Sequence, residues 1–380
     1  SISDILKLVT GVDVRQRGTF GIQTDISING GTFDQTAILL NGMSLSSAQT
    51  GHNAADFPLS ISDIERIEIV SGPAARLMGT SAFGGAINIV TRRPKESNIL
   101  LRAEGGSFGT FDTGATMTLS KGTLQTMIAT GYGQSDGGTE NSDFHQRRAY
   151  WQGNYSKTDY SLRWQTGISS RDYGASTFYS ARFNNQYETT RRIIASVAAD
   201  VAIPGTGIVI SPMVYAHRDM DHYQLTKGLT GAANGENIHR TDNIGAQLNA
   251  NASWRLGRTT IGLDISRDNI LSTAYGELME ESRWKSIRGS ERKYDRKAGR
   301  TNSALTLEHN IVARRLSISA GMTAFRNTGL DNSIRLYPGF DIAYRPAEQW
   351  RLFASWNKSL RLPTFTDLYV ANAVQKDRKS

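Results

Sequence analysis

The chain has 380 residues, of which 38% are hydrophobic, with 37 glycines, 8 prolines and no cysteine. The lack of cysteine excludes disulfides, thiolate metal sites and cysteine nucleophiles. The formal net charge is +8, but the basic residues are scattered outside Ser282–Arg300 and form no nucleic-acid motif, so nucleic-acid binding is not expected. No run reaches the roughly 18 apolar residues of a membrane helix, and the glycine-rich, proline-poor balance favours many strands joined by turns.

The first 96 residues or so are predicted to form a small α+β unit. A short helix is expected around Ser3–Val9, and Asn41-Gly42 marks a chain reversal before the polar loop Met43–Pro58. Short strands are expected at Val12–Arg15, Ile26–Ile28 and Thr36–Leu40.

The stretch Ile61–Pro94 is predicted to contain two packed strands, Ile64–Val70 and Ala86–Thr91, joined by a glycine-rich link. Gly84-Gly85 permits backbone angles that a side chain would forbid. The link has neither the Lys-Ser/Thr pair of a phosphate-binding loop nor a G-x-G-x-x-G pattern before a helix. A nucleotide site is therefore not expected.

From about Asn98 the pattern changes to repeated alternation of apolar and polar residues, and about 13 strands are expected up to Leu360. Ile193, Ala195, Val197 and Ala199, for example, share one face of a strand. Tight turns alternate with mostly long polar connections. These longer connections are predicted at Ser135–Phe144, Asp172–Gln186, His217–Arg240, Asn269–Gly299 and Asn327–Ser333.

Alternation of short turns and long loops is typical of outer-membrane barrels. A soluble sandwich or propeller has no reason to lengthen every second connection. Four aromatic residues lie near strand ends, where membrane-interface girdles occur: Tyr160, Trp254, Trp350 and Trp356. The predicted fold is therefore an all-β transmembrane antiparallel barrel, with a soluble all-β protein as the alternative. Since bacterial barrels have an even number of strands, and Lys376–Ser380 cannot close one, further residues are expected at both ends.

Four motifs resemble those of TonB-dependent outer-membrane receptors. The segment Ile64–Pro94 (IERIEIVSGPAARLMGTSAFGGAINIVTRRP) resembles their plug signature, and Arg361–Tyr369 (RLPTFTDLY) resembles a barrel motif. Ile26–Gly31 (ISINGG) and Ala37–Met43 (AILLNGM) resemble two further plug motifs. The resemblance implies a plug at residues 1–96 inside a barrel at 97–380, which would have about 22 strands if complete.

The sequence departs from the usual plug motifs at four positions. The family usually has Arg at positions 29 and 71, Asp at 41 and an aromatic residue at 78; this chain has Asn29, Ser71, Asn41 and Met78. Loss of two arginines is expected to leave Glu65 and Glu68 with fewer partners.

The resemblance implies that outward-facing plug loops contact the substrate. The implied residues are Gln49, Thr50, His52 and Asn53 in the polar loop, and Thr80, Ser81 and Phe83 in the glycine link. Amides, hydroxyls and an imidazole suit a large polar ligand, although they could equally satisfy neighbouring backbone groups. Four aromatic residues in an external loop suit the flat face of a macrocycle or could pack the loop on itself: Tyr173, Phe178, Tyr179 and Tyr187.

The segment His217–His222 (HRDMDH) resembles a cation-binding cluster. On a strand, however, His217, Asp219 and Asp221 would share a face and His222 would point away. We therefore expect loop composition rather than a metal site. No catalytic arrangement is recognisable, so an enzyme is not expected, and no cofactor is predicted.

Within the family, Gln49–Pro58 (QTGHNAADFP) and Phe178–Glu188 (FYSARFNNQYE) resemble cobalamin-type receptors. The expected function is uptake of cobalamin or another corrinoid across a Gram-negative outer membrane, driven by TonB through an N-terminal segment outside this sequence. The other expected partners are outer-membrane lipid, lipopolysaccharide and a surface lipoprotein. The alternatives are a receptor for a ferric siderophore or haem, a passive porin or adhesion barrel, and a soluble carbohydrate-binding protein.

Overall fold

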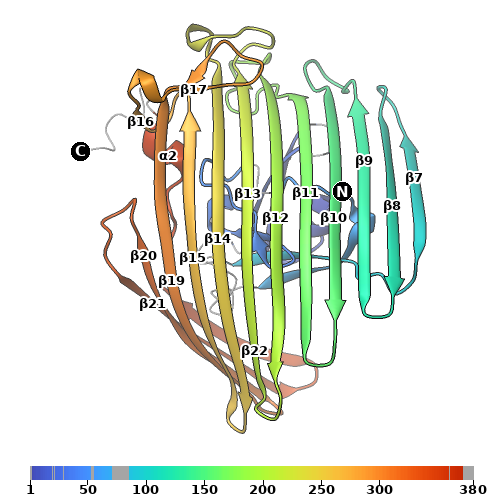
Figure 1. The fold of residues 1–380 in the computed structure, drawn as a ribbon, viewed down its shortest axis with the longest axis vertical. Helices are drawn as coiled ribbons and strands as arrows, with labels where there is room; N and C mark the ends of the chain where they lie inside the picture. The colour runs from blue at the N-terminus through green and yellow to red at the C-terminus, as the bar shows by residue number, and fades with distance from the viewer. Residues whose placement is uncertain are drawn as a thin grey trace.

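The computed structural model describes residues 2–18, 20, 22–28, 30–52, 55–70, 85–358 and 360–370. One large, curved antiparallel sheet forms a wall, and a small α+β unit packs against its inner side (Figure 1). We call these parts the wall and the plug. The first strand of the wall begins at Asn98.

The plug consists of a helix, a hairpin and a four-stranded sheet. Helix α1 (Ile2–Leu6) precedes the antiparallel hairpin of β1 (Val12–Arg17) and β2 (Gln23–Ile28). The sheet order is β4-β3-β6-β5, in which β3 and β6 are parallel and the other pairs antiparallel. Its strands are β3 (Ala37–Leu40), β4 (Met43–Ser44), β5 (Ile64–Val70) and β6 (Ala86–Thr91). Short 3-10 helices precede β3 and β5, at Phe33–Gln35 and Ile61–Asp63.

The predicted bounds of β5 and β6 are confirmed, whereas those of β2 were wrong. Strand β2 begins at Gln23, three residues before the predicted start, and every one of its residues is buried. Its polar residues are buried by contacts with both parts of the molecule: Gln23 bonds Tyr179 of the wall chain, and Asp25 pairs with Arg17 and His52 within the plug. Gly85 has a φ of +141°, and a Cβ there would lie 3.1 Å from Ile28 Cδ1 and from Val70 O. This glycine therefore allows close packing within the plug.

The wall is a 14-stranded sheet in which thirteen strands follow one another and β16 (Glu277–Leu278) pairs with β19 beside them. The predicted number of about 13 strands is thus confirmed. In order, they are β7 (Asn98–Gly105), β8 (Phe111–Lys121), β9 (Leu124–Ser135), β10 (Phe144–Ser156), β11 (Tyr160–Gly174), β12 (Tyr187–Ile203), β13 (Ile208–Gln224), β14 (Asn237–Trp254), β15 (Gly257–Ser272), β19 (Arg296–Val312), β20 (Leu316–Asn327), β21 (Arg335–Ala347) and β22 (Trp350–Asn357).

Tight turns gather at one end of the wall and the longer connections at the other (Figure 1). We call these the turn end and the loop end. The longest connection, between β15 and β19, contains β16, the 3-10 helix Glu281–Arg283 and the hairpin of β17 (Lys285–Ser286) and β18 (Lys293–Tyr294). The remaining short elements are the 3-10 helix Ala232–Asn234 after β13 and helix α2 (Phe365–Tyr369) after β22. The connection predicted to begin at His217 begins after Gln224, because β13 continues with polar side chains on both faces.

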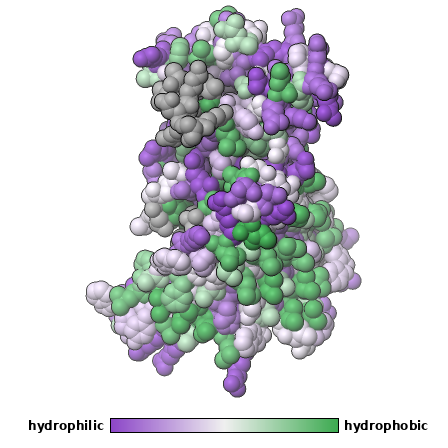
Figure 2. All heavy atoms as spheres, turned by 90° about the vertical axis from the view of Figure 1, so that its left-hand side faces the viewer, coloured by the Kyte–Doolittle hydropathy of each residue, from purple (hydrophilic) through white to green (hydrophobic). Residues whose placement is uncertain are grey.

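The two faces of the wall have opposite polarity. Outward-facing Ile193 and Val197 are exposed, whereas inward-facing Arg192 and His217 are buried. Trp254, Trp350 and Trp356, near strand ends, are also exposed. On the side shown in Figure 2, hydrophobic atoms gather toward the turn end, while hydrophilic atoms dominate the loop end. Apolar residues outside and polar residues inside are the arrangement of a membrane barrel.

No helix within the described ranges is long and apolar enough to cross a membrane.

One hydrophobic core joins the plug to the wall. Plug residues Ile38, Leu40 and Met43 cluster with Tyr150 of β10 and Ile194 of β12, and all five are almost completely buried. The wall therefore completes the core of a plug that is too small to bury its own apolar face.

Candidate functional site

Gln49, in the polar plug loop, is held by two parts of the wall chain. Its Nε2 donates a hydrogen bond to Asp221 Oδ2 of β13 at 2.5 Å, and both side chains are buried. Its carbonyl oxygen accepts from Thr366 Oγ1 at 2.8 Å, just after the wall's β22. The Gln49 side chain therefore fixes the loop to the wall in this structure.

His52 lies in a cluster of aromatic and charged groups. Its Nδ1 is 2.8 Å from Asp25 Oδ1, and Arg17 Nη1 is 3.0 Å from the other Asp25 oxygen. The ring stacks on Phe33 at 4.6 Å between centroids and lies 6.0 Å from the ring of Tyr179. A quarter of the His52 side chain remains exposed. Neighbouring Thr50 accepts a long bond, 3.4 Å, from the His52 amide.

Three of the four predicted aromatic residues come together. The rings of Tyr173 and Phe178 are 6.1 Å apart, and those of Phe178 and Tyr179 are 6.5 Å apart. The Tyr179 hydroxyl accepts from Gln23 Nε2 of the plug and donates to Glu188 Oε2, both at 2.5 Å. Tyr187 lies apart, with Lys227 Nζ 4.6 Å above its ring. The aromatic loop thus contacts the plug through Tyr179.

Four of the predicted binding residues lie outside the described residues: Asn53, Thr80, Ser81 and Phe83. The same holds for Asn29, Ser71 and Met78.

Asp56 is a plug anchor that sequence reasoning missed. Its Oδ1 is 3.1 Å from Arg171 Nε of β11, and its carbonyl oxygen accepts from Arg192 Nη1 of β12 at 3.3 Å. Arg192 also bonds Asp219 Oδ1 at 2.6 Å. The available signal was an arginine at an inward position of an otherwise regular strand, since a buried guanidinium needs a carboxylate or carbonyl partner.

A second anchor comes from the predicted barrel motif. Arg361 donates to Asp34 Oδ2 from Nε at 3.1 Å and from Nη2 at 2.7 Å. Burial raises the pKa of Asp34, and the neighbouring guanidinium of Arg361 only partly opposes this shift. Arg300 of β19 supports the motif by donating to Pro363 O at 2.5 Å.

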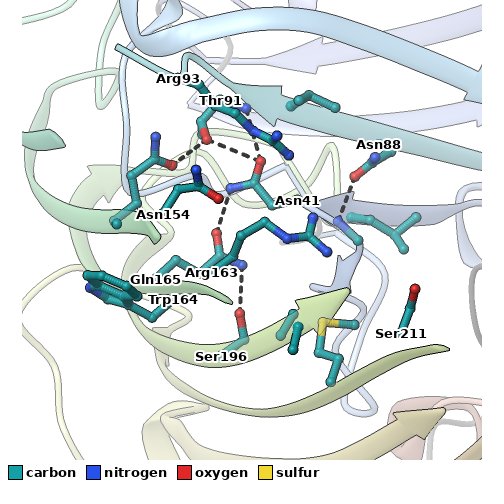
Figure 3. Close-up of a pocket in the computed structure, with 18 of the residues that line it drawn as sticks. Asn41, Asn88, Thr91, Arg93, Asn154, Arg163, Trp164, Gln165, Ser196 and Ser211 are labelled. Atoms are coloured by element: carbon teal, nitrogen blue, oxygen red, sulfur yellow. Dashed lines mark hydrogen bonds between the residues drawn. The ribbon is translucent and has the colours of Figure 1, made fainter. Parts of the chain in front are cut away.

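A 330 Å³ chamber lies between the plug and the wall toward the turn end, and its lining includes eight amide side chains (Figure 3). Asn41 Nδ2 donates to Tyr150 OH at 3.0 Å and to Gln165 Oε1 at 2.8 Å, while its Oδ1 accepts from Thr91 Oγ1 at 3.1 Å. Aspartate, the usual family residue here, could not donate either bond when ionised. Asparagine in place of the family's usual aspartate at position 41 therefore suits the neutral hydrogen-bond partners around it.

Glu65 and Glu68 both form ion pairs with Arg66 of the plug. Arg66 lies 3.3 Å from Glu65 Oε1 and 2.7 Å from Glu68 Oε1, and Asn88 Nδ2 donates to Glu68 Oε2 at 2.9 Å. Burial raises the pKa of Glu68, but hydrogen bonds from Asn88 and Arg66 outweigh it, so that the pKa lies below its ordinary value. Arg66 thus supplies a partner to both carboxylates.

The segment 217–222 divides between the two faces of β13 as predicted. His217, Asp219 and Asp221 are buried inside, whereas His222 Nε2 lies 2.7 Å from Glu236 Oε1. In the described part of the chain, no group of three or more His, Asp or Glu residues is arranged to hold a metal ion.

The fold and the anchored plug define a plugged, membrane-type β-barrel protein. The model of the TonB-dependent Receptor Plug Domain matches residues 1–86, and that of the TonB dependent receptor-like β-barrel matches residues 96–377. The chain belongs to the TonB-dependent receptor family. Such receptors are transporters and not enzymes, in agreement with the sequence-based expectation.

Two curated relatives are vitamin B12 transporters named BtuB. The chain is 36% identical to that of Photobacterium profundum over 119 residues, which cover 31% of this chain and 19% of the relative. It is 35% identical to that of Vibrio vulnificus over 97 residues, which cover 26% and 16%. The matched stretch therefore spans less than a fifth of either relative.

Solved receptors share the fold at low sequence identity. The FrpB iron transporter of Neisseria meningitidis superposes with a TM-score of 0.73 at 15% identity, covering 97% of this chain and 63% of that one. A mutant of the ferric enterobactin receptor PfeA from Pseudomonas aeruginosa gives 0.72 at 16% identity, covering 96% and 60%. These likenesses support the fold and leave the substrate open.

Proposed function

We propose that the protein is an outer-membrane active transporter that binds a corrinoid at the loop end and imports it when TonB acts on the plug. The observation that carries this proposal is the sequence match to two vitamin B12 transporters, joined to a plug seated inside the wall. An occupied lumen cannot conduct freely, so uptake requires the plug to move. This requirement argues against a passive porin.

The charged side chains inside the wall are mostly paired or hydrogen-bonded in this structure. Arg171, Arg192 and Arg300 are matched by Asp56, Asp219 and Asp268. Three further buried carboxyl groups bond neutral partners instead: Glu188 with Tyr179, Asp221 with Gln49 and Asp264 with Gln247. A corrinoid presents a rim of uncharged amides, which suit such hydrogen-bonding groups.

The polar plug loop and the aromatic loop form the proposed substrate site. His52 and Tyr179 supply partly exposed ring faces, which suit a flat macrocycle. The proposed site also includes residues of the same loops and of the glycine link: Thr50, Phe178, Asn53, Thr80, Ser81 and Phe83. Gln49, Tyr173 and Tyr187 are proposed to hold these loops in position.

Calorimetry of the full-length protein with cyanocobalamin tests the substrate. We expect saturable binding at micromolar concentration or below, and none with ferric enterobactin or haem. Binding of ferric enterobactin alone would replace the corrinoid while leaving the transporter class intact. Fractionation tests the class, because the protein should sediment with outer membranes and migrate differently when unheated. Recovery in the soluble fraction would contradict the barrel.

A further inference from the structure

The 330 Å³ chamber toward the turn end contains polar atoms that no described residue satisfies. Asn154 of β10 is only 9% exposed, yet its Oδ1 accepts no hydrogen bond from a described residue. The buried Nε of Arg163, on the neighbouring strand β11, donates none to a described residue. Buried polar atoms are normally hydrogen-bonded. The chamber therefore offers a free acceptor and a free donor on adjacent strands.

The same chamber has a surplus of positive charge. Its charged lining consists of three arginines and one carboxylate: Arg66, Arg93, Arg163 and Glu68. Arg66 pairs with Glu68 at 2.7 Å, and Arg163 Nη2 lies 2.9 Å from Asp200 Oδ2. Arg93, which lines the chamber from the plug side (Figure 3), is exposed and forms no ion pair with a described residue. An unpaired guanidinium and a free guanidinium nitrogen suit a ligand group with one negative charge.

The lining of the chamber is broad and mostly neutral. It extends over the inner face of six adjacent strands, from Gln125 of β9 to Asn249 of β14, which is about 24 Å along the wall. The Asn249 side chain forms no hydrogen bond with a described residue. Because an amide can donate and accept at once, this surface suits a large ligand with several amide groups better than a small ion.

A second cavity adjoins the chamber on the side of the polar plug loop. This 80 Å³ cavity is lined by Gly51 of that loop and by Gln247 of β14, and Gln247 also lines the chamber. Gln247 Nε2 donates to Asp264 Oδ2 at 2.8 Å, which holds the side chain between the two spaces. Gly51 lies between Thr50 and His52 of the proposed outer site. The two cavities therefore mark a polar route from that site toward the turn end.

We propose that the chamber is a second, exit-side site for the transported ligand and binds the phosphodiester-bearing nucleotide arm of a complete corrinoid. This site rests on the proposed corrinoid transport. Its volume is near the lower limit of ligand sites, roughly 300–1,000 Å³, so it admits an arm of the molecule before the whole macrocycle can follow. The phosphodiester supplies a negative charge to Arg93 and Arg163 Nε, and the amide groups supply N–H donors to Asn154 Oδ1.

Energised uptake by cells whose only corrinoid receptor is the full-length protein tests this site with two ligands. Cyanocobalamin carries the nucleotide arm, whereas dicyanocobinamide lacks it. Arg93→Gln/Arg163→Gln should slow cyanocobalamin uptake about tenfold, as expected for lost hydrogen bonds to a charged group. Surface binding of cyanocobalamin and uptake of dicyanocobinamide should both stay close to those of the parent protein.

The matched control is Arg255→Gln/Arg258→Gln, which removes two exposed arginines at the turn end outside the chamber and should transport both ligands as the parent does. Equal slowing of the two ligands in the chamber variant would overturn the exit-side site, because the arginines would then act on the plug. Unchanged cyanocobalamin uptake would overturn it as well. Absence of cyanocobalamin binding by the parent protein would instead refute the proposed function, and the exit-side site with it.

A direct binding measurement does not depend on transport. α-Ribazole phosphate, the isolated nucleotide arm, should show saturation-transfer NMR signals with the full-length protein in detergent. Arg93→Gln breaks no ion pair with a described residue and should weaken this binding, whereas Arg255→Gln should not. Heat-modifiable mobility confirms that each variant retains its barrel. Absence of binding to the parent protein, or displacement by inorganic phosphate at equal concentration, would refute a site for the corrinoid arm.

Discussion

Inward-facing residues at one height of the wall differ between the two halves of the sheet. A single register row runs from β9 to β19, and its first half is apolar whereas its second half is polar and charged. The first half is Ala129, Tyr150, Gly167 and Ile194, and the second half is His217, Asn243, Asp268 and Arg300. Both halves are close to the plug, but only the first belongs to its hydrophobic core.

The difference shows how one plug can be both fixed and movable. Separating apolar surfaces costs roughly 25 cal/mol for each Å² exposed to water, whereas buried polar groups can exchange protein partners for water. On the polar half, Asn243 and Asp264 line a cavity of 80 Å³ beside the plug, while the larger 330 Å³ chamber borders the apolar half. One oxygen of each of these side chains has no hydrogen-bond partner among the described residues. We therefore expect plug movement to open the β13–β19 side first.

Truncation on the apolar half should have the largest effect. Tyr150→Ala removes a buried ring from the shared core and should lower the free energy of unfolding by about 3–5 kcal/mol. Urea unfolding in detergent, followed by tryptophan fluorescence, measures this. Tyr150→Phe is the control, because it loses only the hydroxyl's bonds to Asn41, Gln152 and Gln165 and should cost about 1 kcal/mol. Equal losses would show that hydrogen bonding, not packing, holds this half.

Removing a buried charge on the polar half should lower the free energy of unfolding nearly as much, and removing its partner charge as well should restore most of that loss. Arg300→Leu removes the 2.9 Å partner of Asp268 and should cost about 3 kcal/mol, because a buried carboxylate is left without its cation. Adding Asp268→Asn should recover most of that loss in the same unfolding assay. If the double variant were as unstable as the single, the polar half would be held by packing like the apolar half.

Alternation was enough to predict the wall and its strand number, whereas the membrane-barrel interpretation rested on the spacing of short turns and long connections and on the aromatic residues near strand ends. Each strand faces lipid on one side and the lumen on the other, so the period of two appears locally in residues such as Ile193 and Val197. The signal fails where both faces are polar. Strand β13 continues to Gln224 although His217–Arg240 was predicted as a loop, and β2 begins early because its polar residues are buried.

The anchors between plug and wall were beyond sequence reasoning. Asp56 and Arg192 are 136 positions apart, and the sequence around either residue does not indicate that the other is its partner. Gln49 was predicted to contact the substrate, which stays a prediction, and its bond to Asp221 could not be read from either segment. Family resemblance located the loops, while the pairing of side chains required the fold.

A substitution at Asn41 tests the neutral network of the apolar half. Asn41→Asp introduces the usual family residue, but removes the donor to Tyr150 and Gln165. We expect a loss of about 1–3 kcal/mol in the free energy of unfolding, because two buried acceptors lose a partner. Asn249→Asp is the control in the same chamber and should have less effect. An unchanged stability for Asn41→Asp would mean that water or rearranged amides replace these bonds.

The smallest effect on stability is expected at His52, where the effect on binding should be clear. The ring is partly exposed and stacks on Phe33, so His52→Ala should weaken cyanocobalamin binding about tenfold, roughly 1.4 kcal/mol, with little change in the unfolding midpoint. Gln49→Ala is the matched comparison, since it leaves the buried Asp221 without its donor and should lower both affinity and stability. Calorimetry and unfolding on the same preparations separate the two roles. Unchanged affinity in both variants would remove the plug loop from the substrate site.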